Sequence, residues 1–249
     1  MVTGESWLPL GTHPDAGIRL LCLPHAGAGA SVYKLWGEGL PPDIKACPVQ
    51  PPGRERRRRE KPFTDVRPLA GALAKEIAES VPPPYALFGH STGALCAFEV
   101  LRELRRANGP LPVHLFVSGR CAPQFPMTRH DLAAMGLAEL TDFLRRLGGT
   151  PEEVLADPGL LELLQPLLAA DFSVNEDYAY VPEDPLDIPI TAFAGIDDRG
   201  AGVSRMEPWH VHTSEKFTLH ALQGGHFAVF DHAAAVQTHM VEALLAYRQ

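Results

Sequence analysis

Ser91 lies in a short motif whose residue types and spacing suit nucleophilic catalysis. Residues 89–93 read Gly-His-Ser-Thr-Gly, a G-x-S-x-G pattern. The apolar run Tyr85–Phe88 before it is typical of a buried strand, and the run Ala94–Leu101 after it is typical of a helix. Flanking glycines allow a strand and a helix to approach closely at a sharp turn. We therefore predict that Ser91 is a nucleophile at a helix N-terminus, where partial positive charge favours an anion.

A serine nucleophile needs a general base, and His226 is best placed to supply one. It follows Gly224 and Gly225, after the last strand-like run and before the last helix-like run. The two glycines permit a loop that can present an imidazole to Ser91. The other histidines considered lie inside predicted strands or helices, or directly beside them: His25, His90, His220, His232 and His239.

The acid that orients such a histidine is expected after the preceding strand-like run, which ends at Gly195. Two neighbouring carboxylates, Asp197 and Asp198, follow it. A carboxylate there would accept a hydrogen bond from the far ring nitrogen of His226 and stabilise the imidazolium. We prefer Asp198, the third residue past the glycine, and Asp197 is the alternative.

Two backbone N–H groups are needed to stabilise the oxyanion that forms when the serine attacks. One is expected from Thr92, directly after the nucleophile, and the other from the loop after the first strand-like run. That loop, residues 23–30, reads Leu-Pro-His-Ala-Gly-Ala-Gly-Ala, and we assign the second N–H to Ala26. The full G-x-G-x-x-G pattern of a dinucleotide site is absent from this loop, so the loop does not predict a dinucleotide cofactor.

Composition restricts the function further. The 249 residues are 45% hydrophobic and 21% charged, which is sufficient for one α/β domain. The formal net charge of -8 argues against nucleic acid or an anionic membrane as a partner. The sequence contains no run of about 18 apolar residues, so no membrane span is predicted. Residues 1–7 lack the features of a signal peptide, so the cytoplasm is the expected compartment.

The cysteines and histidines do not predict a metal site. Four widely spaced cysteines fit reduced, mostly buried thiols, and the sequence contains no C-x-x-C pair. His210 and His212 lie in a helix-like run, where side chains two residues apart diverge. We therefore expect no bound metal.

The order of elements predicts an α/β fold with a mainly parallel sheet flanked by helices. Together with the order Ser…Asp…His, it indicates the α/β-hydrolase fold. The expected strands are residues 18–23, 44–50, 85–90, 113–118, 190–195 and 216–222. The expected helices are residues 32–40, 66–81, the run after Ser91, and 233–248, which ends at Arg248.

The alternation of strands and helices breaks between about residue 122 and residue 189. This stretch looks helical, most clearly at Leu137–Leu147 and Pro158–Phe172. It is too long for an ordinary connection, so we expect residues 1–249 to form one domain with a helical lid inserted at about 122–189. The lid would lie over the carboxyl edge of the sheet, where ligands bind. Several of its apolar residues are candidates for an acyl pocket or for the core: Phe143, Leu144, Leu161, Leu164 and Phe172.

With these pieces in place, the chain resembles the type II thioesterases that accompany polyketide synthases and non-ribosomal peptide synthetases. The resemblance covers nearly the whole chain. It rests on Leu23-Pro24-His25-Ala26-Gly27, Pro52-Gly53-Arg54-Glu55 with Arg57, Phe88-Gly89-His90-Ser91-x-Gly93-Ala94, Phe98-Glu99, Leu115-Phe116-Val117-Ser118-Gly119-Arg120 with Ala122-Pro123, Ala170-Asp171-Phe172 with Glu176 and Tyr178, Gly195-x-x-Asp198, Trp209, and Gly224-Gly225-His226-Phe227.

This resemblance implies hydrolysis of acyl thioesters on the phosphopantetheine arm of an acyl or peptidyl carrier protein, without a cofactor. Two features differ from the family pattern: Thr92 stands where methionine is frequent, and the loop after Asp198 is rich in glycine. The main alternative is a serine hydrolase of free small esters or lactones, which would share the same catalytic residues. The basic run Arg54–Lys61 is a candidate docking surface for the carrier protein or, alternatively, a solvated loop. We expect a monomer.

Overall fold

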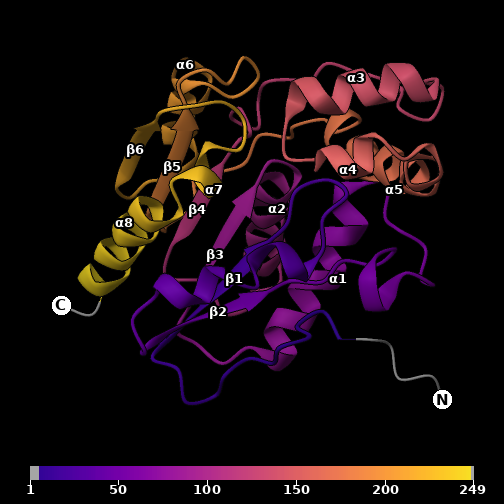
Figure 1. The fold of residues 1–249 in the computed structure, drawn as a ribbon. Coiled ribbons are helices and arrows are strands. Elements are labelled where there is room, and N and C mark those ends of the chain that lie inside the picture. Colours follow the sequence, from indigo (N-terminus) through magenta and orange to yellow (C-terminus); the bar gives the residue numbers. More distant parts are fainter. Residues whose placement is uncertain (1–5, 248–249) are drawn as a thin grey trace.

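Six parallel strands form the centre of the molecule (Figure 1). The computed structural model describes residues 6–247. The strand order is β2-β1-β3-β4-β5-β6, so β3, the strand that leads to Ser91, lies inside the sheet. The strands are β1 (Ile18–Leu23), β2 (Ile44–Pro48), β3 (Tyr85–His90), β4 (Leu115–Ser118), β5 (Ile190–Gly195) and β6 (Phe217–Leu222).

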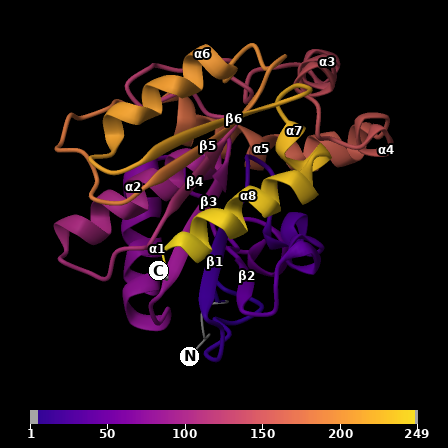
Figure 2. The ribbon, with the colours of Figure 1, turned by 90° about the vertical axis from the view of Figure 1, so that its left-hand side faces the viewer.

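Helices cover both faces of this sheet. Figure 2 shows α8 (Ala233–Ala246) across one face, with α1 (Val66–Ser80) and α2 (Thr92–Arg106) on the other. Because successive side chains of a strand point to opposite faces, Leu87 packs in the α1–α2 core and Phe88 in the α8 core. Burial on both faces explains why the strands read as continuous apolar runs in the sequence.

Several expected elements differ in the structure. The strands expected at 44–50, 113–118 and 216–222 are shorter, as the bounds of β2, β4 and β6 show. The helix predicted at residues 32–40 is instead two short 3-10 helices, η1 (Ala30–Tyr33) and η2 (Trp36–Gly39). Gly39 lies so close to α8 that a Cβ there would collide with the Gln237 side chain, whose amide donates to the Trp36 carbonyl at 2.6 Å. Glycine disfavours a regular α-helix, and the contact between Gly39 and Gln237 holds this segment in the tighter 3-10 turns. The final helix ends at Ala246, and the predicted end, Arg248, lies outside the described residues.

Three helices lie between β4 and β5 in the chain: α3 (Leu137–Leu147), α4 (Glu152–Leu155) and α5 (Pro158–Glu176). They stand beside the sheet at the upper right of Figure 1. This helical insertion has a small apolar cluster of its own, in which Leu144 and Leu161 are buried. Phe143, Leu164 and Phe172 pack against that cluster. These five residues therefore contribute to the core of the insertion.

The described residues show no membrane span and no metal cluster. No helix within residues 6–247 has the length and apolar character needed to cross a bilayer. In the same range, no three His, Cys, Asp or Glu side chains are arranged to hold a metal ion. All four cysteines are buried, as the sequence predicts, and each is a free thiol in the structure.

Several histidines are buried in this fold, which couples stability to pH. His114, directly before β4, is 6% exposed, and its Nε2 lies 2.8 Å from Thr191 Oγ1. Burial, together with the charge of Lys216, lowers the pKa of His114 to about 4. Unfolded His114 takes up a proton below about pH 6.5, whereas the folded side chain does so only near pH 4. Its contribution to stability is therefore full above pH 6.5 and is lost as the pH falls toward 4.

We predict that His114→Gln weakens this pH dependence. Glutamine keeps a hydrogen-bonding group near Thr191 and removes the titration. The difference in unfolding free energy between pH 7 and pH 5 should be smaller than in the wild type by about 2 kcal/mol. Urea unfolding at the two pH values measures it, with His210→Gln, at an exposed histidine, as the matched control. A wild-type pH dependence in His114→Gln would contradict the prediction.

Candidate active site

Ser91 occupies a sharp turn between β3 and α2. Its φ of 55° and ψ of -119° lie where side-chain-bearing residues are rare and strained. The turn has no room for larger neighbours: a Cβ on Gly89 would lie 2.2 Å from the Gly93 carbonyl oxygen, and one on Gly93 would lie 2.2 Å from that of Leu23. The Ser91 N–H donates to the Ser118 carbonyl at 2.8 Å. The backbone of this serine is thus held by both neighbouring strands, β1 and β4.

Asp198 and His226 meet at the edge of the sheet where the Ser91 turn lies. Asp198 Oδ2 lies 2.8 Å from His226 Nδ1, while its Oδ1 accepts the N–H groups of Gly200 and Ala201 at 2.8 and 3.0 Å. The glycine-rich loop after Asp198 therefore holds the carboxylate. Asp197, the alternative considered from the sequence, is exposed. The structure brings Asp198 to His226.

The electrostatics of Asp198 favour its charged form. Burial raises the pKa of Asp198, but the hydrogen bond and charge of His226, together with the two backbone N–H groups, outweigh burial and lower the pKa overall. The carboxylate is therefore ionised at neutral pH. An ionised carboxylate at Nδ1 places the ring proton there and leaves Nε2 as the acceptor.

The His226 ring lies beside the Ser91 turn. Gly119 directly follows Ser118, the residue that accepts the Ser91 N–H. A Cβ on Gly119 would be 3.2 Å from His226 Cε1 and 2.5 Å from His90 Cε1. The rings of His90 and His226 are 5.0 Å apart. Among the hydrogen bonds of residues 6–247, none joins the Ser91 hydroxyl to His226; such catalytic bonds often form only with substrate bound.

Two other histidines near His226 are neutral at neutral pH. Burial, together with the charge of the nearby His226, lowers the pKa of His25 to about 4. Burial also holds the pKa of His90 well below its ordinary value. The His25 ring packs edge-on against Phe227 at 5.0 Å. These rings therefore act as walls of the site, and of these three histidines His226 is the one paired with a carboxylate.

The two expected oxyanion donors have free N–H groups in the described part of the chain. Thr92 is the first residue of α2, and Ala26 lies in the loop after β1. Neither backbone N–H donates to a described residue. Next to Ala26, Gly27 has a φ of 78°, and its N–H donates to Asp171 Oδ2 at 2.7 Å. An anion could therefore accept from both free groups without breaking an existing hydrogen bond.

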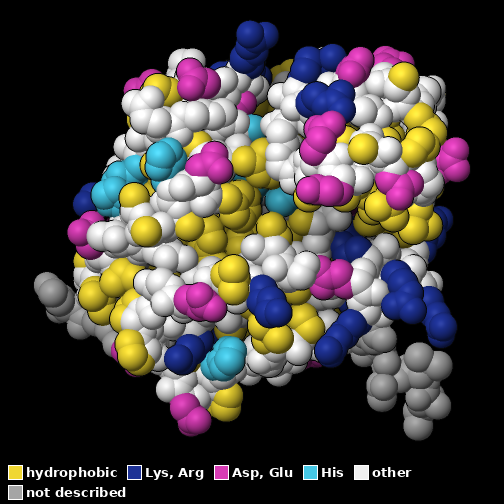
Figure 3. All heavy atoms as spheres, viewed as in Figure 1, with side chains coloured by type: hydrophobic (Ala, Val, Ile, Leu, Met, Phe, Trp, Pro, Cys, Tyr) yellow, Lys and Arg dark blue, Asp and Glu magenta, His cyan; other side chains and the backbone are white. Residues whose placement is uncertain are grey.

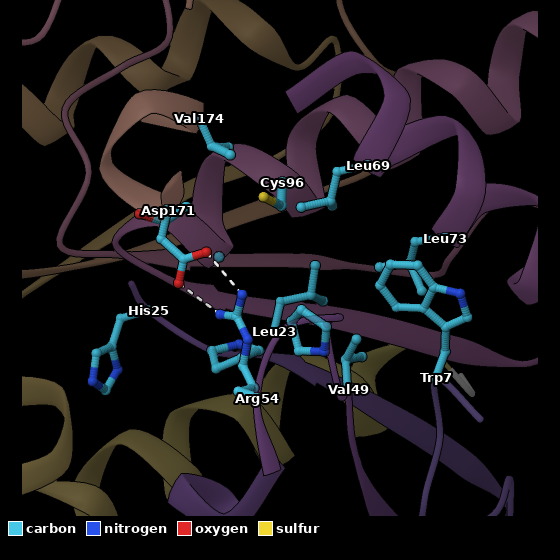
Figure 4. A pocket seen from close by; sticks show the side chains of 14 residues that line it. Trp7, Leu23, His25, Val49, Arg54, Leu69, Leu73, Cys96, Asp171 and Val174 are labelled. Carbon is cyan, nitrogen blue, oxygen red and sulfur yellow. Dashed lines mark hydrogen bonds and ion pairs between the residues drawn. The ribbon is translucent and has the colours of Figure 1, made fainter. Parts of the chain in front are cut away.

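A pocket adjoins this turn, and Arg54 and Asp171 form an ion pair in its wall (Figure 4). The two guanidinium nitrogens of Arg54 lie 2.6 and 2.8 Å from the two carboxylate oxygens. The rest of the lining is mostly apolar, with Thr92 and Gly93 at the turn: Trp7, Leu23, Pro24, His25, Val49, Pro51, Leu69, Leu73, Thr92, Gly93, Cys96 and Val174. The pocket is therefore suited to an apolar group.

The basic run at residues 54–61 is only partly a surface feature. Arg54 and Arg57 are each 7% exposed, and Arg57 is bound by Glu60 and the Gln50 carbonyl. The exposed basic residues of the run are Arg56, Arg58, Arg59 and Lys61. Figure 3 shows Lys and Arg side chains gathered below the helical insertion on this face. The number of charges available for docking is thus smaller than the sequence suggests.

Sequence reasoning missed the polar contacts that join the insertion to the site. Arg54 and Asp171 stand in motifs quoted above, but their pairing spans 117 positions and no local pattern reveals it. Asn175 of α5, whose amide donates to Thr92 Oγ1 at 3.1 Å, was not singled out. His212 is bound to Gln124 at 2.6 Å, which gives it a structural partner.

Comparison with known proteins agrees with this geometry. A family model for the thioesterase domain matches residues 18–244. The gramicidin S biosynthesis protein GrsT of Aneurinibacillus migulanus is 41% identical over 216 residues, which are 87% of this chain and 84% of GrsT. The type II thioesterase BorB from the borrelidin biosynthetic cluster is 38% identical, with a TM-score of 0.85, covering 94% of this chain and 95% of BorB.

A third similar protein is RedJ, a thioesterase from the prodiginine biosynthetic pathway in Streptomyces coelicolor. It is 36% identical, with a TM-score of 0.84 over 92% of this chain and 86% of RedJ. These matches confirm the resemblance to type II thioesterases that the sequence motifs indicate. The chain therefore belongs to the thioesterase domain family, has the α/β-hydrolase fold and is a thioester hydrolase.

Proposed function

We propose that the protein is a type II, editing thioesterase of polyketide or non-ribosomal peptide biosynthesis. Its substrates would be acyl thioesters on the phosphopantetheine arm of an acyl or peptidyl carrier protein. The observation that carries the chemistry is the Asp198–His226 pair, at 2.8 Å, beside the strained turn of Ser91. The relatives GrsT and BorB support the choice of pathway. The cytoplasm is the compartment we propose.

Acylation in this proposal uses Ser91, His226 and Asp198 as a triad. His226 Nε2 takes the proton of the Ser91 hydroxyl as the oxygen attacks the thioester carbonyl. Asp198 stabilises the resulting imidazolium through Nδ1. The N–H groups of Ala26 and Thr92 stabilise the oxyanion. The carbon–sulfur bond then breaks, and the pantetheine thiolate takes the proton from His226.

Deacylation repeats these steps with water. His226 removes a proton from a water molecule as the oxygen attacks the Ser91 ester, and the same two N–H groups stabilise the second oxyanion. The ester bond breaks, Ser91 regains its proton from His226, and the carboxylic acid leaves. In both acylation and deacylation, His226 accepts each proton and then passes it on.

The helical insertion serves in this proposal as a lid over the site. Figure 3 shows hydrophobic and histidine side chains between the insertion and the part of the molecule that contains the sheet. Leu168 of α5 packs against the loop that carries Ala26. The Leu168 Cδ2 lies so close to Gly27 that a Cβ added to this glycine would be only 2.6 Å from it. A lid in this place would border the channel for the pantetheine arm and limit the entry of water.

We predict that Ser91→Ala abolishes the removal of acyl groups from carrier proteins. Without the hydroxyl no acyl-enzyme forms, so the rate should fall by at least about 10⁴-fold. Carrier proteins loaded with acetyl, butyryl or aminoacyl phosphopantetheine are incubated with each enzyme, and their intact mass is followed. Retention of every acyl group by wild type, with rapid hydrolysis of free esters or lactones, would instead support the small-ester hydrolase.

A second prediction separates the two neighbouring carboxylates. Asp198→Asn should lower kcat by about 10³- to 10⁴-fold, because an amide neither fixes the His226 tautomer nor stabilises the imidazolium. Asp197→Asn is the matched control, since its side chain is exposed, and should stay within about twofold of wild type. Hydrolysis of a p-nitrophenyl ester by each purified variant measures both. Equal losses in the two variants, or a loss in Asp197→Asn alone, would refute the assignment.

A further inference from the structure

We infer that helix α5 holds both proposed oxyanion donors in place through Asp171 and Asn175, which are positioning residues for the reaction. The inference rests on the proposed function, because the oxyanion hole belongs to it. Asp171 and Asn175 are four residues apart on α5, so they share one side of the helix. Each is 6% exposed. One helix face thus presents two buried polar groups to the site.

Asp171 holds the loop that carries Ala26. Its Oδ2 accepts the N–H of Gly27 at 2.7 Å, one peptide beyond the Ala26 N–H. Gly27 has a φ of 78°, a conformation open to glycine because it lacks a Cβ, and the Asp171 hydrogen bond holds the loop in it. Leu168, three residues earlier on α5, packs against the same glycine. The direction of the Ala26 N–H therefore depends on the position of α5.

Asn175 holds the other donor. Its Nδ2 donates to Thr92 Oγ1 at 3.1 Å, and its Oδ1 accepts from Arg120 Nε at 2.9 Å. Because a guanidinium can only donate, Arg120 fixes which end of the amide faces Thr92. Arg120 is itself 1% exposed. The first residue of α2 is thus tied to the insertion through its hydroxyl.

Arg54 compensates the negative charge of Asp171, which would otherwise oppose catalysis. An isolated carboxylate close to the oxyanion donors would repel the negative charge that develops during acylation. Arg54 binds both oxygens of Asp171, at 2.6 and 2.8 Å, and its Nη1 also donates to the Ala28 carbonyl at 3.3 Å. The pair therefore orients the loop without presenting net charge.

This arrangement gives the insertion a role in the rate of acylation itself. A movement of α5 would displace the Ala26 loop and the Thr92 turn together, because one helix face holds both. Loss of either contact should misalign a donor without removing it. The effect should therefore fall on kcat, and KM should change little, because the contacts orient groups that act on the oxyanion of the transition state.

The test compares Asn175→Ala with Gln165→Ala. Gln165 is a matched control because its amide also lies on α5, but it donates to the Leu132 and Met135 carbonyls within the insertion. Active sites are counted by complete labelling with a fluorophosphonate, and hydrolysis of p-nitrophenyl butyrate is expressed per labelled site. Counting sites removes the effect of unfolded protein.

We expect Asn175→Ala to lose about ten- to a hundredfold in kcat per site, with KM within about threefold of wild type. The inhibition constant of a phenylboronic acid, whose tetrahedral adduct places an oxygen at the oxyanion position, should rise in parallel. Gln165→Ala should retain both values. A kcat per site within twofold of wild type, or equal losses in the two variants, would overturn the inference.

A second pair keeps the test decisive if Asn175→Ala does not fold. Thr92→Val replaces the hydroxyl that Asn175 binds with a methyl group, whereas Thr92→Ser keeps the hydroxyl and loses the methyl group, so the valine variant should lose more kcat per site than the serine variant. Equal values would overturn the inference. Failure of the proposed function is a distinct result: wild type would then leave every acyl group on the carrier proteins, whatever the variants do on p-nitrophenyl butyrate. If the triad itself were wrong, wild type would show neither fluorophosphonate labelling at Ser91 nor ester hydrolysis, and the inference would fall with it.

Discussion

The backbone of Ser91 is the constraint on which the rest of the structure depends. A side-chain-bearing residue at a φ of 55° is held only by surroundings that leave it no alternative. Those surroundings are Gly89 and Gly93, which contact backbone atoms directly, and the Ser118 carbonyl on β4. β3 lies between β1 and β4, and α2 is buried along most of its length. The rigid centre of the fold thus fixes the serine.

The partners of Ser91 reach it from separate parts of the chain. Asp198 and His226 follow β5 and β6, and the parallel sheet brings the carboxyl ends of these strands to one edge. The helical insertion approaches the same edge and supplies buried polar side chains at Asp171 and Asn175. The insertion is therefore joined to the site by hydrogen bonds as well as by apolar packing.

The sequence allowed much of the fold to be predicted, for physical reasons. Strands buried on both faces read as continuous apolar runs, and the predicted limits of Ile18–Leu23, Tyr85–His90 and Ile190–Gly195 match the structure. The predicted helix at residues 32–40 was wrong, because the contact between Gly39 and Gln237 is made across the fold and leaves no local pattern. The Arg54–Asp171 pair escaped prediction for the same reason.

The central claim is that acyl transfer passes through Ser91, and a direct measurement is to trap the intermediate. Enzyme mixed with an acyl carrier protein is quenched within milliseconds, digested, and mapped by mass spectrometry. We expect the mass of the acyl group on the peptide that contains Ser91, appearing before the free acid. Release of the acid with no acylated peptide, or acylation at another residue, would contradict the account.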